Sequence, residues 1–438
     1  MVSILDPFYG TQNEMSADSV TRQILNELFG NQPFKNLSIR LWNDSYWPDE
    51  EERPATLVLQ HPAALRNMLS PESEKGLAEA YIRNDFDIEG NMECAFELLD
   101  RIKERTQGWS KKLKIDHLLR NLPTRPCTEN LFNRRASLHG RAHSEQRDRQ
   151  AIQFHYDLSN EFYSLWLDPH MSYSCAYFRN LTDSLEMAQT QKLDYICQKL
   201  RLRPGELLLD IGCGWGTLVM HAVAHYGVRA IGITLSQRQA DYAQERIRRL
   251  RLQNQIEIRL QDYREIQGER LFDKISSIGM VEHVGEKNLP DYFRQIYSLL
   301  KPGGLFLNHG IGCGPRPMDR YEDSFMDRYV FPDGELVPIS KMIEPGEKQG
   351  FEVRDVENLR EHYALTLRQW VNRLESQHDQ ILDHVPESIY RIWRLYMTGC
   401  IVSFQKGSMA IYQALFSKLD ASGKANYPLT RESLYPHK

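Results

Sequence analysis

The stretch Leu207-Leu208-Leu209-Asp210-Ile211-Gly212-Cys213-Gly214-Trp215-Gly216 decides the fold. Its first five residues are mostly apolar, and a short apolar run that ends at a glycine predicts a buried strand. A helical pattern begins at Thr217, directly after the last glycine. A strand, a glycine-rich turn and a helix in this order are typical of an α/β sheet with a ligand crevice at the carboxyl end of the strand.

Strand and helix patterns alternate along the chain after this stretch. Short apolar segments predict further strands at 230–234, 256–260, 274–278 and 305–308, and helical patterns cover 217–226, 237–252 and 291–300. Ser236 precedes the second of these helices with Gln239 three residues later, which is a capping pattern, and Lys301-Pro302-Gly303-Gly304 predicts a helix stop and a turn. This alternation predicts a parallel sheet with helices on both faces.

The composition limits the classes to which this chain can belong. It has 438 residues, which suits two domains, and its formal net charge of −5 gives no overall positive field for a nucleic acid. Seven cysteines without a CxxC pair exclude a disulfide framework and a zinc ribbon, and they predict a reducing compartment. The N-terminal residues lack a signal-peptide pattern, and no apolar run is long enough to span a bilayer. We therefore expect a cytoplasmic protein.

Three regions are predicted along the chain. Residues 1–122 show strand patterns near 37–41 and 57–59 and helical patterns at 21–29, 62–69, 72–84 and 92–107, which indicate a small α+β domain. Residues 123–150 are polar and basic, and they predict a linker, either a mobile one or a solvated loop without a role. Residues 151–438 contain the predicted sheet. The arginines of the predicted linker are Arg134, Arg135, Arg141, Arg147 and Arg149.

The glycine-rich turn predicts the ligand. Gly212 and Gly214 let the backbone approach a ligand closely, and the helix that follows points its free N–H groups at the same place. The spacing Asp-x-Gly-x-Gly-x-Gly differs from the dinucleotide pattern, and no Lys-Ser or Lys-Thr pair follows, which excludes a nucleotide P-loop. Asp210 would repel a pyrophosphate but suits the ammonium group of S-adenosylmethionine. The alternative is a tight turn without a ligand.

Two further strand ends are expected to complete the cofactor pocket. Many methyltransferases hold the ribose with a carboxylate after the second strand, whereas this chain has Thr234, Ser236 and Gln239 there. Hydroxyl and amide groups would therefore bind the ribose. Asp262 is expected to accept a hydrogen bond from the adenine amino group, and Tyr263 to stack on the ring, while the alternative for both residues is a strand-end turn.

Three motifs resemble a known family. They are Tyr-Asp-Leu-Ser-Asn-Glu-Phe-Tyr at 156–163, Met-Ser-Tyr-Ser-Cys-Ala-Tyr-Phe at 171–178 and Gly-Met-Val-Glu-His-Val-Gly at 279–285. With the cofactor turn, they resemble the cyclopropane-fatty-acid-phospholipid synthases, relatives of the mycolic acid cyclopropane synthases. The resemblance implies a Rossmann-like class I methyltransferase sheet with helical insertions. Residues 1–122, with Arg53-Pro54-Ala55-Thr56-Leu57, look like the lipid-binding N-terminal domain of the full-length bacterial synthases.

The resemblance also implies a reaction and the residues that perform it. A methyl group passes from S-adenosylmethionine to the cis double bond of an acyl chain in a phospholipid, and a bound bicarbonate ion removes a proton so that a cyclopropane ring closes. Carried over by motif, the bicarbonate ligands are Cys175, Glu282, His309, the main chain at Ile311, and Tyr363. A further family cysteine, here Cys400, is sometimes labelled catalytic, but it lies in an apolar helical stripe that favours packing.

Alkylation of an alkene requires alignment, exclusion of water and stabilisation of a passing cation. Tyr173, Tyr177 and Phe178 are predicted to supply aromatic faces for that cation. His309 and Tyr363 can donate to an anion, although each residue of this set also has a simpler interpretation as a packed core residue. The residues predicted to bind the cofactor are Tyr173, Ser174, Asp210, Gly212, Cys213, Gly214, Trp215, Gly216, Thr234, Leu235, Ser236, Gln239, Gln261, Asp262 and Tyr263.

The implied substrate lies in a phospholipid bilayer, so we expect peripheral association with the inner face of the membrane. The basic linker and the segment 389–418, which mixes aromatic and basic residues, are the candidates for contact. The alternative for the second segment is an amphipathic helix packed on the core. A homodimer is compatible with the sequence.

Other activities stay open at this point. Fatty acid methyltransferases share the first step but end in a methylene- or methyl-branched chain, and plant-type N-methyltransferases share parts of the same core. A catalytically dead lipid-binding protein is an alternative of another class, and the intact cofactor turn argues against it.

Overall fold

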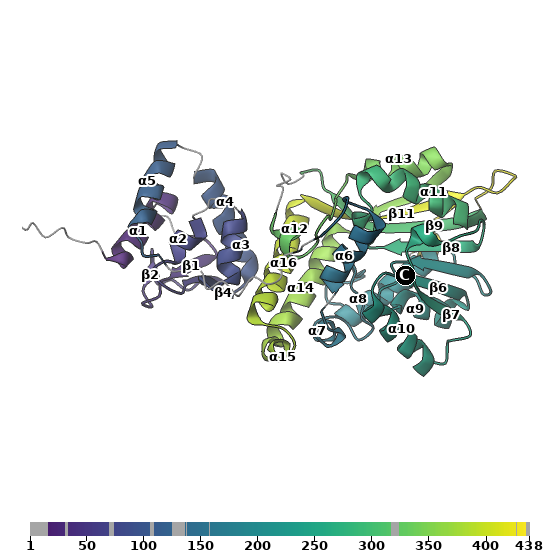
Figure 1. Cartoon of the computed structure of the whole chain (residues 1–438), viewed down its shortest axis with the longest axis horizontal. Helices are drawn as coiled ribbons and strands as arrows, with labels where there is room; N and C mark the ends of the chain where they lie inside the picture. Colours follow the sequence, from purple (N-terminus) through teal and green to yellow (C-terminus); the bar gives the residue numbers. More distant parts are fainter. Residues whose placement is uncertain are drawn as a thin grey trace, which may run out of the picture. The chain divides into compact units, whose positions relative to one another are not determined.

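The computed structural model describes residues 16–30, 34–69, 74–105, 109–124, 136, 138–156, 158–316, 324–425 and 427–434. The chain divides into two compact units, Met1–Leu131 and Phe132–Lys438, which we call unit 1 and unit 2 (Figure 1). Arg134 and Arg135 of the predicted linker and Asp157 of the first family motif lie outside the described residues.

Unit 1 contains a four-stranded sheet in the order β2-β1-β3-β4. β1 and β3 are parallel, and the two outer pairs are antiparallel. Ile39 and Leu57 are buried at the centre of the sheet, and α1 buries its apolar stripe, which includes Ile24. The elements are α1 Ala17–Phe29, β1 Leu37–Arg40, β2 Tyr46–Trp47, β3 Ala55–Leu59, α2 Ala64–Leu69, α3 Glu74–Ile82, β4 Phe86–Gly90, η1 Met92–Cys94, α4 Ala95–Arg105 and α5 Trp109–Arg120.

Unit 2 is built on a sheet whose strands, within the described ranges, stand in the order β10-β11-β9-β8-β5-β6-β7. The strands from β9 to β7 are parallel, while β11 runs antiparallel to both β9 and β10. β5 lies between β6 and β8, so the strand order reverses there and a crevice opens at its carboxyl end. The strands are β5 Leu207–Ile211, β6 Arg229–Thr234, β7 Ile256–Leu260, β8 Phe272–Ile278, β9 Leu300–Cys313, β10 Phe351–Asn358 and β11 Met409–Lys418.

Helices cover both faces of this sheet, as the alternating pattern predicts. On one face α8, α9 and α10 bury Val219 and Ile247 with Leu208, and on the other α11 and α13 bury Phe293 with Ile275. The helices of unit 2 are α6 Glu145–Tyr156, α7 Asn160–Ser164, α8 Leu185–Lys199, α9 Thr217–Tyr226, α10 Gln237–Arg249, α11 Leu289–Leu299, α12 Phe325–Tyr329, α13 Ile339–Gln349, α14 Arg360–Ser376, α15 His378–Leu382 and α16 Glu387–Lys406, with short 3-10 turns η3 Tyr263–Glu265, η4 Val281–His283, η5 Glu286–Asn288 and η6 Glu432–Leu434.

The predicted strands and helices of unit 2 lie within a few residues of the observed ones, and Ser236 caps α10 by accepting from Gln239 N. Two differences concern β9 and β11. The segment 301–304, predicted as a turn, belongs to β9, where the register against β8 shifts to accommodate it. β11 lacks a sequence prediction because it follows α16 after a short turn at Gly407, so its apolar residues continue the apolar pattern of the helix.

The linker is shorter than the predicted 123–150. α6 begins at Glu145, inside that range, and belongs to unit 2. At its N-terminal end the inward-facing side chains are charged, because Arg147 pairs with Asp333 and the buried Asp148 pairs with Arg264, whereas Ala151 is buried one turn later. These ion pairs attach the start of α6 to unit 2, although this part of the helix lacks the apolar residues that would predict a packed helix.

The segment 389–418 is part of the core rather than a surface. α16 packs on α14, with the rings of Tyr363 and Phe404 4.9 Å apart. Trp393 and Tyr396 are buried, and Arg394 pairs with Glu375. This burial favours the alternative of a helix packed on the core over contact of these side chains with a membrane.

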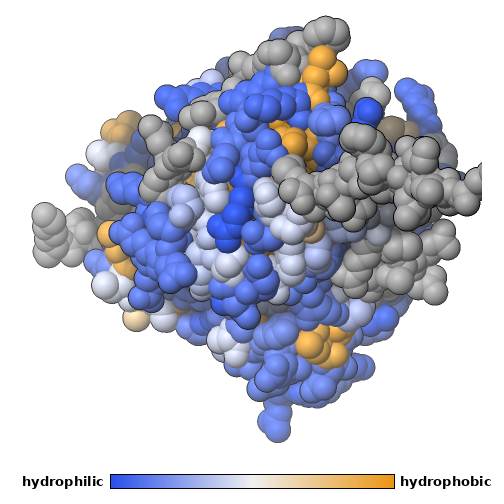
Figure 2. Space-filling model, turned by 90° about the vertical axis from the view of Figure 1, so that its left-hand side faces the viewer, coloured by the Kyte–Doolittle hydropathy of each residue, from blue (hydrophilic) through white to orange (hydrophobic). Residues whose placement is uncertain are grey.

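No helix in the described part of the chain combines the length and the apolar character needed to cross a membrane. On the face shown in Figure 2, hydrophilic residues predominate outside the grey atoms, and hydrophobic residues form small separate areas. Contact between this face and a bilayer would therefore involve mainly polar side chains.

Candidate active site

The cofactor turn lies where the strand order reverses, at the carboxyl end of β5. A pocket opens there, lined by the ends of β5, β6, β7 and β8, by the segment 171–174 and by residues of α6 and α8. Gly216 and Ser236 do not line it, and instead they begin the helices α9 and α10. The predicted cofactor residues that do line it are Tyr173, Ser174, Asp210, Gly212, Cys213, Gly214, Trp215, Thr234, Leu235, Gln239, Gln261, Asp262 and Tyr263.

Asp210 supplies a negative charge to the pocket. Ser276 Oγ donates a hydrogen bond to Asp210 Oδ1 at 2.7 Å, and Oδ2 has no hydrogen-bond partner among the described residues. Burial raises the pKa of Asp210 to about 6, against the opposing effects of Ser276 and Lys192. Because this pKa lies below 7, Asp210 is mostly ionised at neutral pH and can accept from an ammonium group.

The glycine-rich turn is held tightly between neighbouring elements. Gly216 has a φ of +78°, which a residue with a side chain rarely adopts, and a Cβ there would lie 3.1 Å from Ala243 Cβ. On β6, a Cβ at Gly232 would lie 2.9 Å from Cys213 Sγ. These two glycines let the turn pack against α10 and β6 at once, which fixes its position relative to Asp210.

Polar groups after β6 stand where the ribose is expected. Thr234 Oγ1 donates to Gln239 Oε1 at 2.8 Å, and Ser236 N donates back to Thr234 Oγ1. Ser236 Oγ accepts from Gln239 N as the cap of α10. Thr234 and Gln239 thus face the pocket as a preformed pair, whereas Ser236 supports them from outside it.

The carboxylate of Asp262 has a different environment from the one predicted. Both of its oxygens accept from Arg264, with Nη2 to Oδ2 at 2.7 Å, so the expected hydrogen bond from an adenine amino group would have to share them. Asp262 also caps η3. Tyr263 packs edge-on against Tyr292, with ring centroids 5.4 Å apart, which orients its own ring at the pocket wall.

α6, the first helix of unit 2, forms part of the pocket wall. Asp148, Ile152 and Tyr156 of this helix line the pocket. Arg264 Nη2 lies 3.0 Å from Asp148 Oδ2 while it also binds Asp262. The guanidinium of Arg264 therefore connects α6 to the residues that follow β7.

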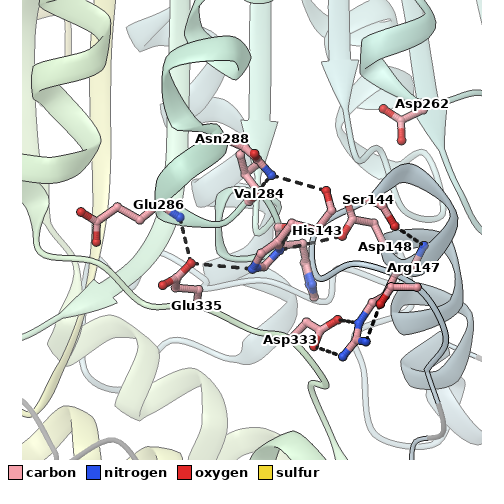
Figure 3. A network of polar contacts seen from close by, with 12 residues as sticks. His143, Ser144, Arg147, Asp148, Asp262, Val284, Glu286, Asn288, Asp333 and Glu335 are labelled. Atoms are coloured by element: carbon pink, nitrogen blue, oxygen red, sulfur yellow. Dashed lines mark hydrogen bonds and ion pairs between the residues drawn. The ribbon is translucent and has the colours of Figure 1, made fainter.

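A polar network continues from α6 to the loop after β8. Figure 3 shows His143 between Asn288 on one side and Glu335 on the other. His143 Nε2 lies 3.7 Å from Glu335 Oε2, and its Nδ1 lies 3.3 Å from the carbonyl oxygen of His283. Glu335 N donates to Glu282 O at 2.9 Å. These contacts fix the loop that carries Glu282.

Glu282 reaches strand β9 two residues beyond His309, and the neighbouring Met280 and His283 line the pocket. Glu282 Oε1 accepts from Ile311 N at 2.6 Å, and Gln413 Nε2 donates to His309 Nδ1 at 3.3 Å. Burial raises the pKa of Glu282 to about 7 and lowers the pKa of His309 to about 3. His309 is therefore neutral, and with Nδ1 accepting, its proton lies on Nε2. Glu282 Oε2 and His309 Nε2 are both buried without a hydrogen-bond partner among the described residues.

Tyr363 and the two predicted cysteines complete this cluster. Burial is the main cause that raises the pKa of Tyr363, and its hydroxyl lies close enough to Cys175, Cys400 and Glu282 for their ionised forms to raise it further. Cys175 Sγ donates to the carbonyl oxygen of Ala176 at 3.3 Å. Burial raises the pKa of the Cys175 thiol and raises that of Cys400 to about 12, so both thiols stay protonated at neutral pH. Neither has the thiolate character of a nucleophile.

Packed aromatic rings connect the pocket to Tyr363, because Tyr173 lines the pocket and Trp370 packs against both tyrosines. Tyr173 lies 5.3 Å from Trp370 and 5.4 Å from Trp166 between ring centroids. Tyr177 does not join them, because it stacks on Tyr195 and His362, and Phe178 N donates to the same histidine. The expected aromatic environment is therefore supplied by other rings than Tyr177 and Phe178. They are Tyr156, Tyr163, Trp166, Trp215, Trp370, Trp393 and Tyr396.

Several residues of the pocket lack a sequence prediction, and four of them are Tyr156, Lys192, Arg264 and His283. Two of them had a usable signal, because Tyr156 opens the first family motif and His283 follows Glu282 within the third. Lys192 and Arg264 lie on a helix and a 3-10 turn without a motif, so the sequence offers no signal for them.

Comparison with known proteins agrees with this geometry. The family model described as mycolic acid cyclopropane synthetase matches residues 143–414. A probable fatty acid methyltransferase of Pseudomonas putida is 37% identical over 402 residues, which cover 91% of this chain and 96% of that protein. The cyclopropane-fatty-acyl-phospholipid synthase of Escherichia coli strain K12 is 34% identical over 365 residues, 83% of this chain and 88% of that protein.

One solved structure matches part of this chain and nearly all of its own. The mycolic acid cyclopropane synthase CmaA1, determined in complex with SAH and CTAB, is 34% identical, with a TM-score of 0.58. The match covers 61% of this chain and 97% of that one. Its SAH (S-adenosylhomocysteine) supports S-adenosylmethionine as the cofactor of this chain.

Proposed function

The chain belongs to the mycolic acid cyclopropane synthetase family of S-adenosylmethionine-dependent methyltransferases, and on that premise we propose that it closes a cyclopropane ring on an acyl chain. The acceptor would be the cis double bond of an unsaturated chain esterified in a phospholipid. The donor would bind in the β5 crevice, and the acyl chain would reach the aromatic rings beside it.

One observation carries this proposal: Glu282 Oε2 and His309 Nε2 are both buried without a hydrogen-bond partner in the described part of the chain. An unsatisfied buried polar atom is costly, so a pair of them next to a cofactor pocket indicates a bound polar group. One atom is an acceptor or a titratable hydroxyl, and the other is a neutral N–H donor. A bicarbonate ion, which has both a hydroxyl and anionic oxygens, fits this combination.

Each of these residues would have its own role in the proposed reaction. Glu282 would accept from the hydroxyl of the ion, while His309 Nε2 and the hydroxyl of Tyr363 would donate to its oxygens. Bound there, bicarbonate would supply the base that accepts the proton released on ring closure. The rings of Tyr173 and Trp370 would stabilise the positive charge on the acyl chain, and their packing would exclude water. Asp210 would hold the ammonium end of the donor.

The decisive experiment combines purified full-length protein, S-adenosylmethionine and vesicles of a phospholipid with cis-unsaturated chains. Mass spectrometry should show the gain of one CH2 per acyl chain, and gas chromatography of the released methyl esters should match a cyclopropane standard. Omission of bicarbonate from degassed buffer should slow turnover, and added bicarbonate should restore it. Unchanged lipid in the presence of bound cofactor would refute the proposed acceptor.

A second candidate is a fatty acid methyltransferase that leaves a methylene- or methyl-branched chain. The observation that favours it is the match to the Pseudomonas putida protein, which extends over nearly all of both chains. The same assay separates the two, because branched and cyclopropane esters have different retention times. A branched product would replace the first proposal with the second.

The acceptor would be reached by peripheral contact with the bilayer. Arg141 and Arg149 are exposed, and Arg149 makes only a long contact of 3.8 Å with Glu265, whereas Arg147 is held by Asp333. The first two are therefore more available to anionic headgroups than Arg147. Changing both to glutamine should weaken binding to anionic vesicles, and Arg147→Gln should have a smaller effect. If all variants bind the vesicles equally well, these arginines do not contact the bilayer, and unit 1 becomes the candidate for lipid binding.

A further inference from the structure

A buried lysine of the cofactor pocket lacks an ionic partner. Lys192, on α8, is 3% exposed and lines the pocket with Ser174 and Asp210. Its Nζ donates to Ser174 Oγ at 2.9 Å. No carboxylate of the described residues lies within ion-pair distance of it, in contrast to Lys199 on the same helix, which contacts Asp355 and Glu357.

The nearby acids are engaged by other groups. Asp168 accepts from the backbone N–H groups of His170 and Ser172, and Asp210 accepts from Ser276. A buried ammonium group has three donors, and a single hydroxyl satisfies only one of them. Burial of such a group without a paired anion is strongly unfavourable. The position therefore calls for an anion that enters the pocket.

We propose that Lys192 binds the carboxylate of the methionine part of S-adenosylmethionine, with Ser174 holding the lysine in place. Lys192 would then bind the carboxylate of the amino-acid end, and Asp210 would bind its ammonium group. This inference rests on binding of the cofactor in this pocket and does not depend on which lipid is alkylated.

The experiment is a thermodynamic cycle on the full-length chain, measured by calorimetry. The ligands are S-adenosylmethionine and decarboxylated S-adenosylmethionine, which keeps the sulfonium and the ammonium but lacks the carboxylate. The wild-type protein should bind the first about 10- to 100-fold more tightly, the range for a hydrogen bond to a charged group. Lys192→Met should bind the two ligands about equally, because only the carboxylate contact is lost.

Lys274→Met is the matched control. Lys274 is another buried lysine of unit 2, 3.8 Å from Glu206, and it does not line the pocket. This control should keep the wild-type preference for the carboxylated ligand. Equal weakening of both ligands by Lys192→Met would overturn the proposal, because it would show that the lysine only shapes the pocket.

The wild-type measurement keeps the test decisive if Lys192→Met does not fold. A wild-type protein that binds both ligands with equal affinity would overturn the proposal without any variant. Lys192→Gln, which can keep the hydrogen bond to Ser174, should lose the preference as Lys192→Met does. In every outcome, binding of S-adenosylmethionine by the wild-type protein is measured independently of lipid alkylation.

Discussion

Replacing Glu282 by glutamine should raise stability at high pH while it removes turnover. The amide keeps the shape of the side chain and an oxygen that can accept from Ile311 N, and it removes only the ionisation. Burial raises the pKa of Glu282 from 4.5 to about 7. At 1.36 kcal/mol per pH unit, holding the ionised carboxylate in the folded chain costs about 3 kcal/mol, as an upper limit.

The sign of the pH effect follows from this shift. The folded chain retains a proton that the unfolded chain loses as pH rises from 4.5 to about 7, so native stability is lost over this window and stays lost above it. The glutamine variant has no such loss. Between about pH 5.5 and pH 8, its stability relative to the wild-type protein should therefore increase by about 2 kcal/mol.

Urea unfolding of both proteins at the two pH values measures this difference. Any fixed cost of burying the amide cancels, because it is the same at both pH values. Calorimetry should show nearly unchanged affinity for S-adenosylmethionine, since Glu282 does not line the cofactor pocket. Turnover should fall by about 100-fold or more, the usual effect of losing a group that assists proton transfer. A stability difference independent of pH would refute the buried ionisation, and full turnover would refute the catalytic assignment.

Three further results are expected. Affinity for S-adenosylmethionine should fall by up to about tenfold per pH unit below pH 6, because Asp210 must lose its proton to accept the ammonium group, and calorimetry that shows no change from pH 5 to 8 would contradict this. Gly285→Ala should lower stability by about 1–3 kcal/mol and reduce turnover, because φ is +79° and the new Cβ would lie 2.6 Å from the His143 ring. Thermal unfolding measures the loss of stability. The control Gly205→Ala, with φ +84° and no atom within 4 Å, should show the smaller effect of backbone strain alone. Arg264→Met should speed release of S-adenosylhomocysteine in stopped-flow measurements, because it disconnects Asp148 of α6 from Asp262, and an unchanged release rate would show that α6 does not limit exit.

The cofactor half of the site could be predicted because its signals are local. Asp210, the glycines and Thr234 stand at strand ends, and strand ends follow from apolar runs of five residues. Lys192 could not be found in this way. It lies in a helix whose buried face includes polar residues, and only the packing of α8 beside Ser174 shows that its side chain enters the pocket.

The proposed catalytic residues could be identified only by resemblance. Glu282, His309 and Tyr363 come from three elements, and no spacing in the sequence brings them together. The partner of His309, Gln413, lies on β11, which has no strand signal separate from the preceding helix. α6 is predicted as part of a linker, because its ion pairs with Asp333 and Arg264 cannot be recognised from a pattern of apolar residues.

The position of β11 has a consequence for synthesis on the ribosome. This strand lies inside the sheet between β9 and β10, although its residues, Met409–Lys418, are made after all the other strands. Until they emerge, β9 has an open edge, and an open edge is a template for pairing with other chains. His309 lies on that edge strand and lacks Gln413 over the same interval. A nascent or prematurely terminated chain would therefore be both inactive and prone to aggregate, so folding and catalytic competence are completed together, near the end of translation.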